Sequence, residues 1–185
     1  QVRQGQALQA AEQRFRATFD QAAVGIVHLD AEGRLLRANQ RICDILGYQR
    51  GELEGRSFRE VRHPDDQEGE TEPLARLASG EQAISRTERR HLRKDGSVVW
   101  LACTTAAARD SPQEPPYFIL VAEDVTERRN QERRLREAAA VFASSQEGLV
   151  VTGLDGSIRM INPAFTAITG YEEAEAVGRN MRLLN

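Results

Sequence analysis

The chain has 185 residues, of which 40% are hydrophobic and 29% charged, and 25 basic against 28 acidic side chains give a formal net charge of -3. Such a composition is typical of one globular domain or a little more, and it excludes a disordered or fibrous chain. The charges alternate in sign along the chain, so neither nucleic acid nor an anionic membrane is expected as a partner.

The cysteine pattern and the lack of long apolar runs indicate the compartment. Cys43 and Cys103 form neither a CxxC pair nor a Cys/His cluster, so no zinc site and no disulfide framework is expected. No apolar run approaches the roughly 20 residues that cross a bilayer, and the polar start, Gln1 to Gln6, is not a signal peptide. We expect a reduced, cytoplasmic chain without membrane contact of its own; any anchor would lie outside this segment.

The first half of the chain predicts helices around two short strands. In chain order the elements are an amphipathic helix over residues 1–22, strands Val24–Leu29 and Arg34–Ala38, a helix that follows Asn39, a short helix Arg50–Leu53, and a helix around Asp65–Ala78. Gly33 suits the turn between the strands, and Gly47 suits the end of the helix after Asn39.

The second half predicts three longer strands, Ala83–Arg93, Ser97–Ala108 and Tyr117–Ala122. A capping box, Asp124 to Glu127, then converts the last strand directly into a helix, Glu127–Phe142. The fold class is α+β: a five-stranded antiparallel sheet with helices packed on one face, plus long connecting helices.

An internal repeat with a shift of 123 residues defines the domain organisation. It aligns Gly25 with Gly148, Asn39 with Asn162, and the pair Gly47-Tyr48 with Gly170-Tyr171. A period this long means two domains in tandem. The expected boundaries are an N-terminal helix 1–22, a first domain 23–126, a linker helix 127–142, and the N-terminal part of a second, incomplete domain 143–185.

The repeated pattern resembles the PAS domain superfamily. The matching stretches run from Asn39 to Gly55, through His63-Pro64-Asp65-Asp66 and Arg93 to Trp100, and end at Glu123 to Arg128; the second copy matches from Gly148 to about Leu184. The resemblance implies a non-catalytic sensory module that forms homodimers. It also implies an effector domain in the same polypeptide, usually a histidine kinase or a cyclic-di-GMP enzyme.

In PAS domains ligands lie between the sheet and the helices, and this resemblance gives the candidate pocket. The candidate lining residues are Ile26, His28, Ile42, Leu46, Phe58, Val61, Trp100, Ala102 and Phe118. Small residues on the strand of Ala102 to Thr104 leave room for a small-molecule ligand. A packed core explains the same residues, so a filled interior stays open as an alternative.

The three histidines do not cluster. His28 either points into the pocket or is satisfied by a neighbour. His63 belongs to a His-Pro-Asp-Asp turn that caps the following helix through Asp65 and Asp66. His91 lies among arginines, which is typical of a solvated strand face. No phosphate-binding loop, nucleophile elbow or acidic metal cluster is present in the sequence, so no enzyme activity and no metal site are expected.

Haem or flavin binding has little support in the sequence. PAS haem sensors carry the axial histidine on the long helix, and Gln67 to Leu77 contains none. Residues 178–184 resemble the flavin-photoreceptor motif, but Met181 stands at the position of the reactive cysteine, and Phe58 occupies it in the first copy. A thioether cannot form the covalent flavin adduct. A non-covalent haem or flavin sensor is kept as an alternative.

The strand-to-helix junction is the predicted signal relay, through Asp124, Thr126, Glu127 and Arg128. Apolar seams on the two long helices predict a short parallel coiled coil, with dimer residues Leu8, Phe15, Phe19, Leu135 and Phe142. The preferred interpretation is a sensor that binds a ligand, dimerises and signals through the linker helix. A ligand-free homodimerisation scaffold is the alternative.

Overall fold

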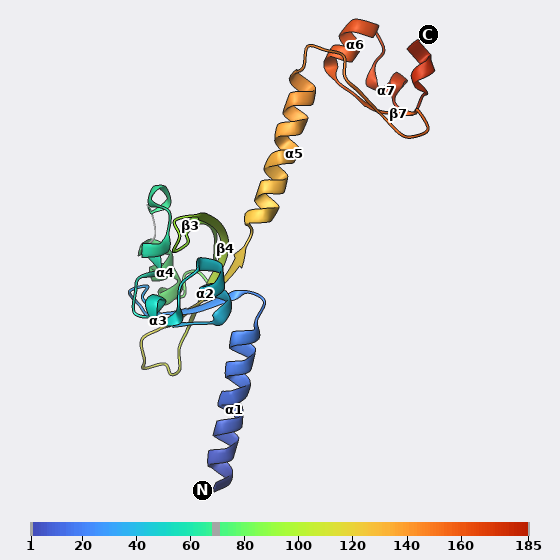
Figure 1. The fold of residues 1–185 in the computed structure, drawn as a ribbon. Helices are drawn as coiled ribbons and strands as arrows, with labels where there is room; N and C mark the ends of the chain where they lie inside the picture. The colour runs from blue at the N-terminus through green and yellow to red at the C-terminus, as the bar shows by residue number, and fades with distance from the viewer. Residues whose placement is uncertain (1, 68–70, 185) are drawn as a thin grey trace. The chain divides into compact units, whose positions relative to one another are not determined.

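The computed structural model describes residues 2–67 and 71–184, except for the side chains of residues 2–4, 71–73, 183 and 184. The chain divides into two compact units, residues 1–127 and 128–185 (Figure 1).

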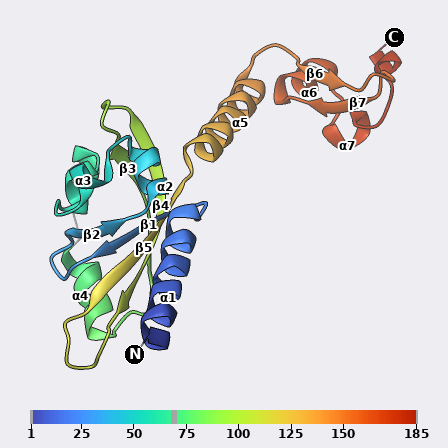
Figure 2. The ribbon, with the colours of Figure 1, turned by 60° about the horizontal axis from the view of Figure 1, so that its bottom comes forward.

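The first unit is built on one five-stranded antiparallel sheet, as the sequence predicts. Its strands are β1 (Gly25–Leu29), β2 (Leu35–Ala38), β3 (Ser85–Leu92), β4 (Val98–Ala108) and β5 (Tyr117–Asp124). They are arranged in the order β2-β1-β5-β4-β3 (Figure 2). The strand that ends the domain, β5, therefore lies at the centre and pairs with both β1 and β4.

The short helices of this unit are α2 (Gln40–Leu46), α3 (Arg50–Leu53) and α4 (Thr71–Ser79), with 3-10 turns η1 (Phe58–Val61) and η2 (Pro64–Asp66). The prediction of one helix around Asp65–Ala78 is wrong. Pro64 instead opens a 3-10 turn, where Nδ1 of His63 accepts a hydrogen bond of 3.3 Å from the backbone N–H of Asp65. The α-helix begins only at Thr71.

Alternation along the strands defines an inner and an outer face of the sheet. On β1, Val27 and Leu29 are buried with α2 and η1 in one core, while the alternating residues Ile26 and His28 are half-buried. The outer face is partly covered by the end of α1 (Val2–Gln21), because the rings of Phe15 and Phe19 lie 6.5 and 5.5 Å from the ring of His28. The sheet thus has a helix against each face.

A buried asparagine side chain joins three elements at the start of the first domain. Asn39 is fully buried, and its carbonyl oxygen accepts from the N–H groups of Ile26 (2.9 Å) and Ile42 (3.1 Å). Its amide group donates to the carbonyls of Phe19 (2.8 Å) and Val24 (3.0 Å). One side chain therefore fastens the end of α1 to the start of β1 and of α2.

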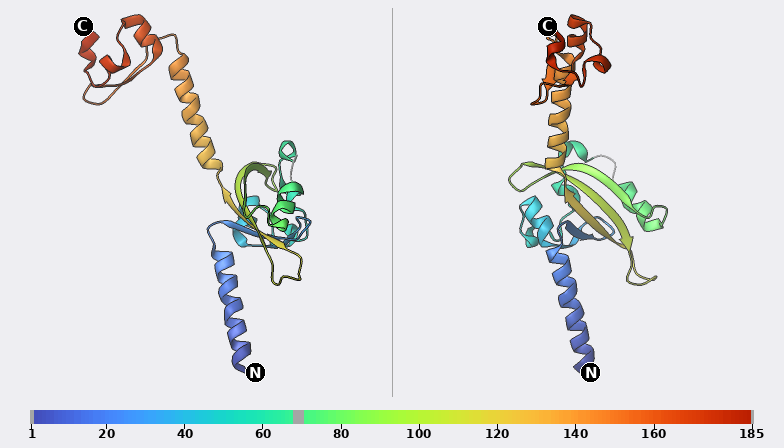
Figure 3. Two further views of the ribbon diagram at one scale, coloured as in Figure 1. Left: turned by 180° about the vertical axis from the view of Figure 1, so that it is seen from behind. Right: turned by 90° about the vertical axis from the view of Figure 1, so that its right-hand side faces the viewer.

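The second unit repeats this arrangement. It contains most of α5 (Thr126–Ser144), then β6 (Val150–Thr152), β7 (Ile158–Ile161), α6 (Pro163–Thr169), α7 (Glu173–Ala176) and η3 (Met181–Leu184) (Figure 3). Asn162 accepts from Leu149 and Phe165, and donates to the carbonyls of Phe142 (3.1 Å) and Glu147 (2.9 Å). Each of these four partners lies 123 positions after the corresponding partner of Asn39.

Candidate functional site

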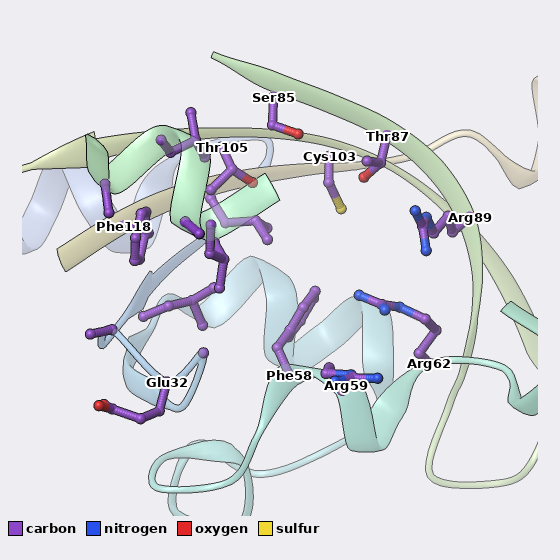
Figure 4. Close-up of a pocket in the computed structure, with 18 of the residues that line it drawn as sticks. Glu32, Phe58, Arg59, Arg62, Ser85, Thr87, Arg89, Cys103, Thr105 and Phe118 are labelled. Atoms are coloured by element: carbon purple, nitrogen blue, oxygen red, sulfur yellow. The ribbon is translucent and has the colours of Figure 1, made fainter. Parts of the chain in front are cut away.

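A cavity of about 250 Å³ lies in the first unit against the inner face of the sheet (Figure 4). Its lining residues from the helices and loops are Ala31, Glu32, Gly33, Phe58, Arg59, Arg62, Leu74, Ala75, Leu77 and Ala78, and those from the strands are Leu29, Ser85, Thr87, Arg89, His91, Cys103, Thr105, Phe118 and Leu120. The walls are therefore mostly β3, β4, β5 and α4.

The structure places only two of the nine predicted pocket residues, Phe58 and Phe118, in this lining. Three more, Ile42, Leu46 and Val61, are buried in the adjoining core without lining the cavity. The remaining four, Ile26, His28, Trp100 and Ala102, occupy the half-buried positions that alternate with the inner face of β1 and β4. Their assignment to the cavity is wrong because each strand is apolar on both faces.

The outward direction of His28 is visible in its contacts. Its ring lies 5.5 Å from that of Phe19 and 5.7 Å from that of Tyr117. Partial burial, and then the charge of Arg37, lower the pKa of His28 below its usual value. The structure therefore gives His28 a neighbour-packed position, the second of the two alternatives.

His91 is the residue that the sequence misplaced most clearly. It is not on a solvated face: it is 2% exposed, pairs with Val99 of β4, and lines the cavity. Burial lowers the pKa of His91 to about 4, so the ring is neutral at pH 7. Its Nδ1 lies 3.3 Å from the carbonyl oxygen of Arg89, and its Nε2 is buried without a hydrogen-bond partner.

The arginines of the lining lie toward one end of the cavity. In Figure 4, Arg59, Arg62 and Arg89 lie together at one end, and Phe118 lies at the other, with Phe58 between them. Arg62 is only 4% exposed, and the ring centroids of Phe58 and His91 are 5.3 Å apart. The lining therefore combines charged and apolar side chains.

The predicted relay residues form a hydrogen-bonded junction at the end of β5. Oδ1 of Asp124 accepts from the backbone N–H of Thr126 at 3.0 Å, and Oγ1 of Thr126 accepts from the N–H of Trp100 at 2.9 Å. Arg93 donates to Asp124 at 3.3 Å and to the carbonyl of Ile45 at 2.9 Å. The first turn of α5 is thus tied to β4, and Asp124 is tied through Arg93 to the last turn of α2.

The other two relay candidates belong to α5 itself. Glu127 is the acidic residue of the first turn of α5, where a negative charge is favourable. Arg128 pairs with Glu132 one turn later at 3.6 Å.

The predicted dimer residues differ in exposure. Leu8 and Leu135 are each 72% exposed and Phe15 is 44% exposed, whereas Phe142 is half-buried. Phe19 is buried at 6% exposure because it packs against His28 and the end of β1, so it does not belong to an exposed seam.

The described residues contain no group of three or more His, Cys, Asp or Glu side chains that could hold a metal ion. Met181 packs against the small core of Ile158 and Phe165 in the second unit. At about 250 Å³ the cavity is smaller than the roughly 300–1,000 Å³ usual for drug-sized ligands, so we derive no haem or flavin site from it.

Within the described part of the chain, no helix combines the length and the apolar character that a bilayer crossing requires.

A five-stranded sheet of this strand order, with helices over a cavity and a last strand that runs directly into a helix, defines one class of α+β domain. Comparison with known families identifies which one: the PAS fold family matches residues 19–130, and a second PAS domain family matches residues 133–185. The chain belongs to the PAS family, with two domains in tandem, of which the second is short.

Relatives of known description carry the same module inside larger proteins. The chain is 31% identical over 122 residues to a probable diguanylate cyclase, DgcE, of Escherichia coli, covering 66% of this chain and 11% of that protein. It is 30% identical over 131 residues to the sensor histidine kinase TmoS of Ectopseudomonas mendocina, covering 71% of this chain and 14% of that protein. The chain thus spans only about a tenth to a seventh of these relatives.

Solved structures agree on the fold. A PAS domain of an HTR-like protein from Haloarcula marismortui superposes with a TM-score of 0.58 at 27% identity, over 67% of this chain and 99% of that one. A domain of a sensory box sensor histidine kinase/response regulator from Geobacter sulfurreducens gives a TM-score of 0.53 at 26% identity, over 63% and 96%. This chain is therefore a PAS sensory module related to domains of diguanylate cyclases and sensor histidine kinases.

Proposed function

We propose that a small molecule in the cavity of the first domain is the signal, and that the junction at Asp124 and Thr126 passes its effect into α5. The effector is a domain of the same polypeptide, of the cyclase or histidine kinase type found in the relatives.

One observation carries the proposal: the cavity and the junction share strand β4. Cys103 and Thr105 line the cavity, and Trp100, on the same strand, donates to Thr126 at the start of α5. A second hydrogen bond joins the same residue to the junction: the backbone N–H of Val125 donates to the carbonyl of Trp100 at 2.9 Å. A ligand that shifts β4 by a few tenths of an ångström would change both bonds, because a paired strand moves as one element.

The test has two steps on the purified chain. Native mass spectrometry first identifies any co-purified small molecule, and amide hydrogen exchange then compares the ligand-bound and ligand-free forms. Ligand should slow exchange in β4 and change it at the Trp100 and Val125 amides. A ligand that protects the cavity wall but leaves those two amides unchanged would contradict the relay.

The matched variant is Thr126→Val, which removes the hydroxyl acceptor and keeps the shape. It should bind the ligand as the wild type does while the response at Trp100 disappears; Thr126→Ser, which keeps the hydroxyl, should preserve the response. In the full-length protein, Thr126→Val should abolish regulation of the effector by the ligand without abolishing the activity of the effector. Thr126→Ser should retain both.

A dimerisation role is favoured by the surface of α5. No residue of this helix is buried, and Leu135 and Val141 are 72% and 68% exposed. A second copy would cover them in a parallel coiled coil. Sedimentation velocity should show a dimer that Leu135→Glu weakens and Arg136→Glu, at the adjacent exposed position, does not; a wild-type monomer at high micromolar concentration would contradict dimerisation through this chain.

A further inference from the structure

Among the described residues that line the cavity, His91 carries a buried ring nitrogen, Nε2, that has no hydrogen-bond partner. His91 is 2% exposed, lines the cavity, and leaves Nε2 without a hydrogen-bond partner. A buried polar atom in that state costs stability until something pairs with it. The contact of the other ring nitrogen, Nδ1, determines whether Nε2 needs a hydrogen-bond donor or an acceptor as its partner.

The geometry fixes which nitrogen of His91 carries the proton. Nδ1 lies 3.3 Å from the carbonyl oxygen of Arg89. A carbonyl only accepts, so Nδ1 is the N–H and Nε2 holds a lone pair in the neutral ring. Burial is the largest cause of the lowered pKa of His91, and the charge of Arg62 lowers it further, while the hydrogen bond to the Arg89 carbonyl and the charge of Asp66 raise it. The cavity wall therefore offers an acceptor and requires a donor.

We propose that the cavity selects a neutral ligand with a hydroxyl group on an apolar body, the hydroxyl donating to Nε2 of His91. The inference rests on the proposed function and names the ligand class of the same cavity. A hydroxyl is suited because it donates and accepts at once. Its oxygen can accept from the guanidinium of Arg62, which lines the cavity and forms an isolated β-bridge with His91.

The apolar part of the ligand follows from the remaining walls. Phe58, Leu77, Phe118 and Leu120 are buried side chains of the lining. An apolar cavity of about 150 Å³ admits benzene in another protein, so a volume of about 250 Å³ has room for one ring with a short substituent.

A carboxylate is the competing ligand class, because three arginines line the cavity against one acidic residue, Glu32, among the described residues. A carboxylate at neutral pH only accepts, so it would face the lone pair of Nε2 with its own. It would bind well only if His91 took up a proton, which burial of the ring disfavours. The hydroxyl class needs no such change.

The test compares three probes that share one apolar body: 4-ethylphenol, 4-ethylbenzoate and ethylbenzene, titrated at pH 7 into the isotope-labelled chain by NMR. We expect 4-ethylphenol to bind at least about tenfold more tightly than ethylbenzene, and more tightly than 4-ethylbenzoate. The ¹⁵N signal of His91 Nε2 should shift on adding 4-ethylphenol while the ring stays neutral.

The outcomes separate this inference from the proposed function. Tighter binding of 4-ethylbenzoate with protonation of His91, or equal binding of 4-ethylphenol and ethylbenzene, overturns the hydroxyl class while leaving a ligand-binding cavity. If no probe perturbs the signals of the lining residues at millimolar concentration, both the inference and the ligand-binding proposal fail.

A pair of histidine variants provides the test and its matched control. His91→Phe removes the acceptor and should bring the affinities of 4-ethylphenol and ethylbenzene to within about twofold of each other. His28→Phe makes the same change on the opposite face of the sheet and should leave the preference intact. If His91→Phe does not fold, the wild-type probe series and the His91 ¹⁵N signal still decide.

Discussion

The hydroxyl oxygen of Thr126 accepts a hydrogen bond of 2.9 Å from the backbone N–H of Trp100 and so joins the first residue of α5 to strand β4. The junction has a second bond from Thr126, because its own N–H donates to Asp124 at 3.0 Å. A single threonine therefore stands at the start of α5, after β5, and also ties this start to the neighbouring strand β4.

Thr126→Val should cost about 1 kcal/mol of unfolding free energy, since the Trp100 N–H loses its acceptor and the helix loses a side-chain oxygen at its start. Chemical denaturation measures this loss, and faster hydrogen exchange of the Trp100 amide should accompany it. Thr126→Ser should stay within a few tenths of a kcal/mol of the wild type. Equal stability of the valine and serine variants would contradict the role assigned to the hydroxyl.

Removing the buried asparagine should be more costly. Asn39→Ala leaves the groups of four hydrogen bonds without their partner, so we expect a loss of roughly 3 kcal/mol or more. Urea denaturation of the chain measures it, with Gln40→Ala at the exposed neighbouring position as control. A loss below about 1 kcal/mol would mean that water replaces the amide.

The buried ring of His91 predicts a stability that falls with acidity. Its pKa is lowered from 6.5 to about 4, so between these values the unfolded chain binds a proton and the folded chain does not. The protonation of His91 therefore does not reduce the free energy of unfolding above pH 6.5. As the pH falls toward 4, this group lowers the free energy of unfolding by up to roughly 3 kcal/mol. Denaturation at pH 7.0 and 4.5, beside an NMR titration of the His91 ring, tests it; a ring that titrates near 6.5 would contradict the burial argument.

The carboxylate of Asp66 predicts a change in a lower range. It accepts from the N–H of Arg90 at 2.9 Å and from Nε of the same residue at 3.1 Å, and these bonds lower the pKa of Asp66 from 3.8 to about 2. Its contribution is present above pH 3.8 and is lost as the pH falls through 2. The difference in melting temperature between wild type and Asp66→Asn should thus shrink between pH 4 and pH 2. A constant difference over that range would exclude the ion pair as its cause.

Much of the fold could be predicted because turn glycines are local signals and the internal repeat shows them twice at equivalent positions. Gly47 and Gly170 have φ values of 75° and 77° at equivalent helix ends, so the alignment of the two copies reflects backbone geometry that glycine adopts most readily. The break before α4 was missed because the stretch after Pro64 has few apolar residues to mark a period.

The site was harder to predict because a polar cavity wall resembles a solvated surface. Ser85, Thr87, Arg89 and His91 alternate along β3 and all line the cavity, yet their composition is that of an exposed face. On β1 the reverse error occurred. Ile26 and His28 were predicted to face the cavity, but they lie on the outer face of the sheet, which α1 partly covers. Alternation alone could have grouped His91 with Ser85, but it could not say which group faced inward.

The paired asparagines give the chain a common connector. Asn39 holds the carbonyl of Phe19 at the end of α1, and Asn162 holds that of Phe142 near the end of α5, with closely similar bond lengths. In each domain, a buried asparagine thus binds the helix that precedes the domain through the same kind of hydrogen bond. Gene duplication can therefore add another copy of a helix and its domain without any change at the junction between them. This is one physical route by which a sensory chain lengthens.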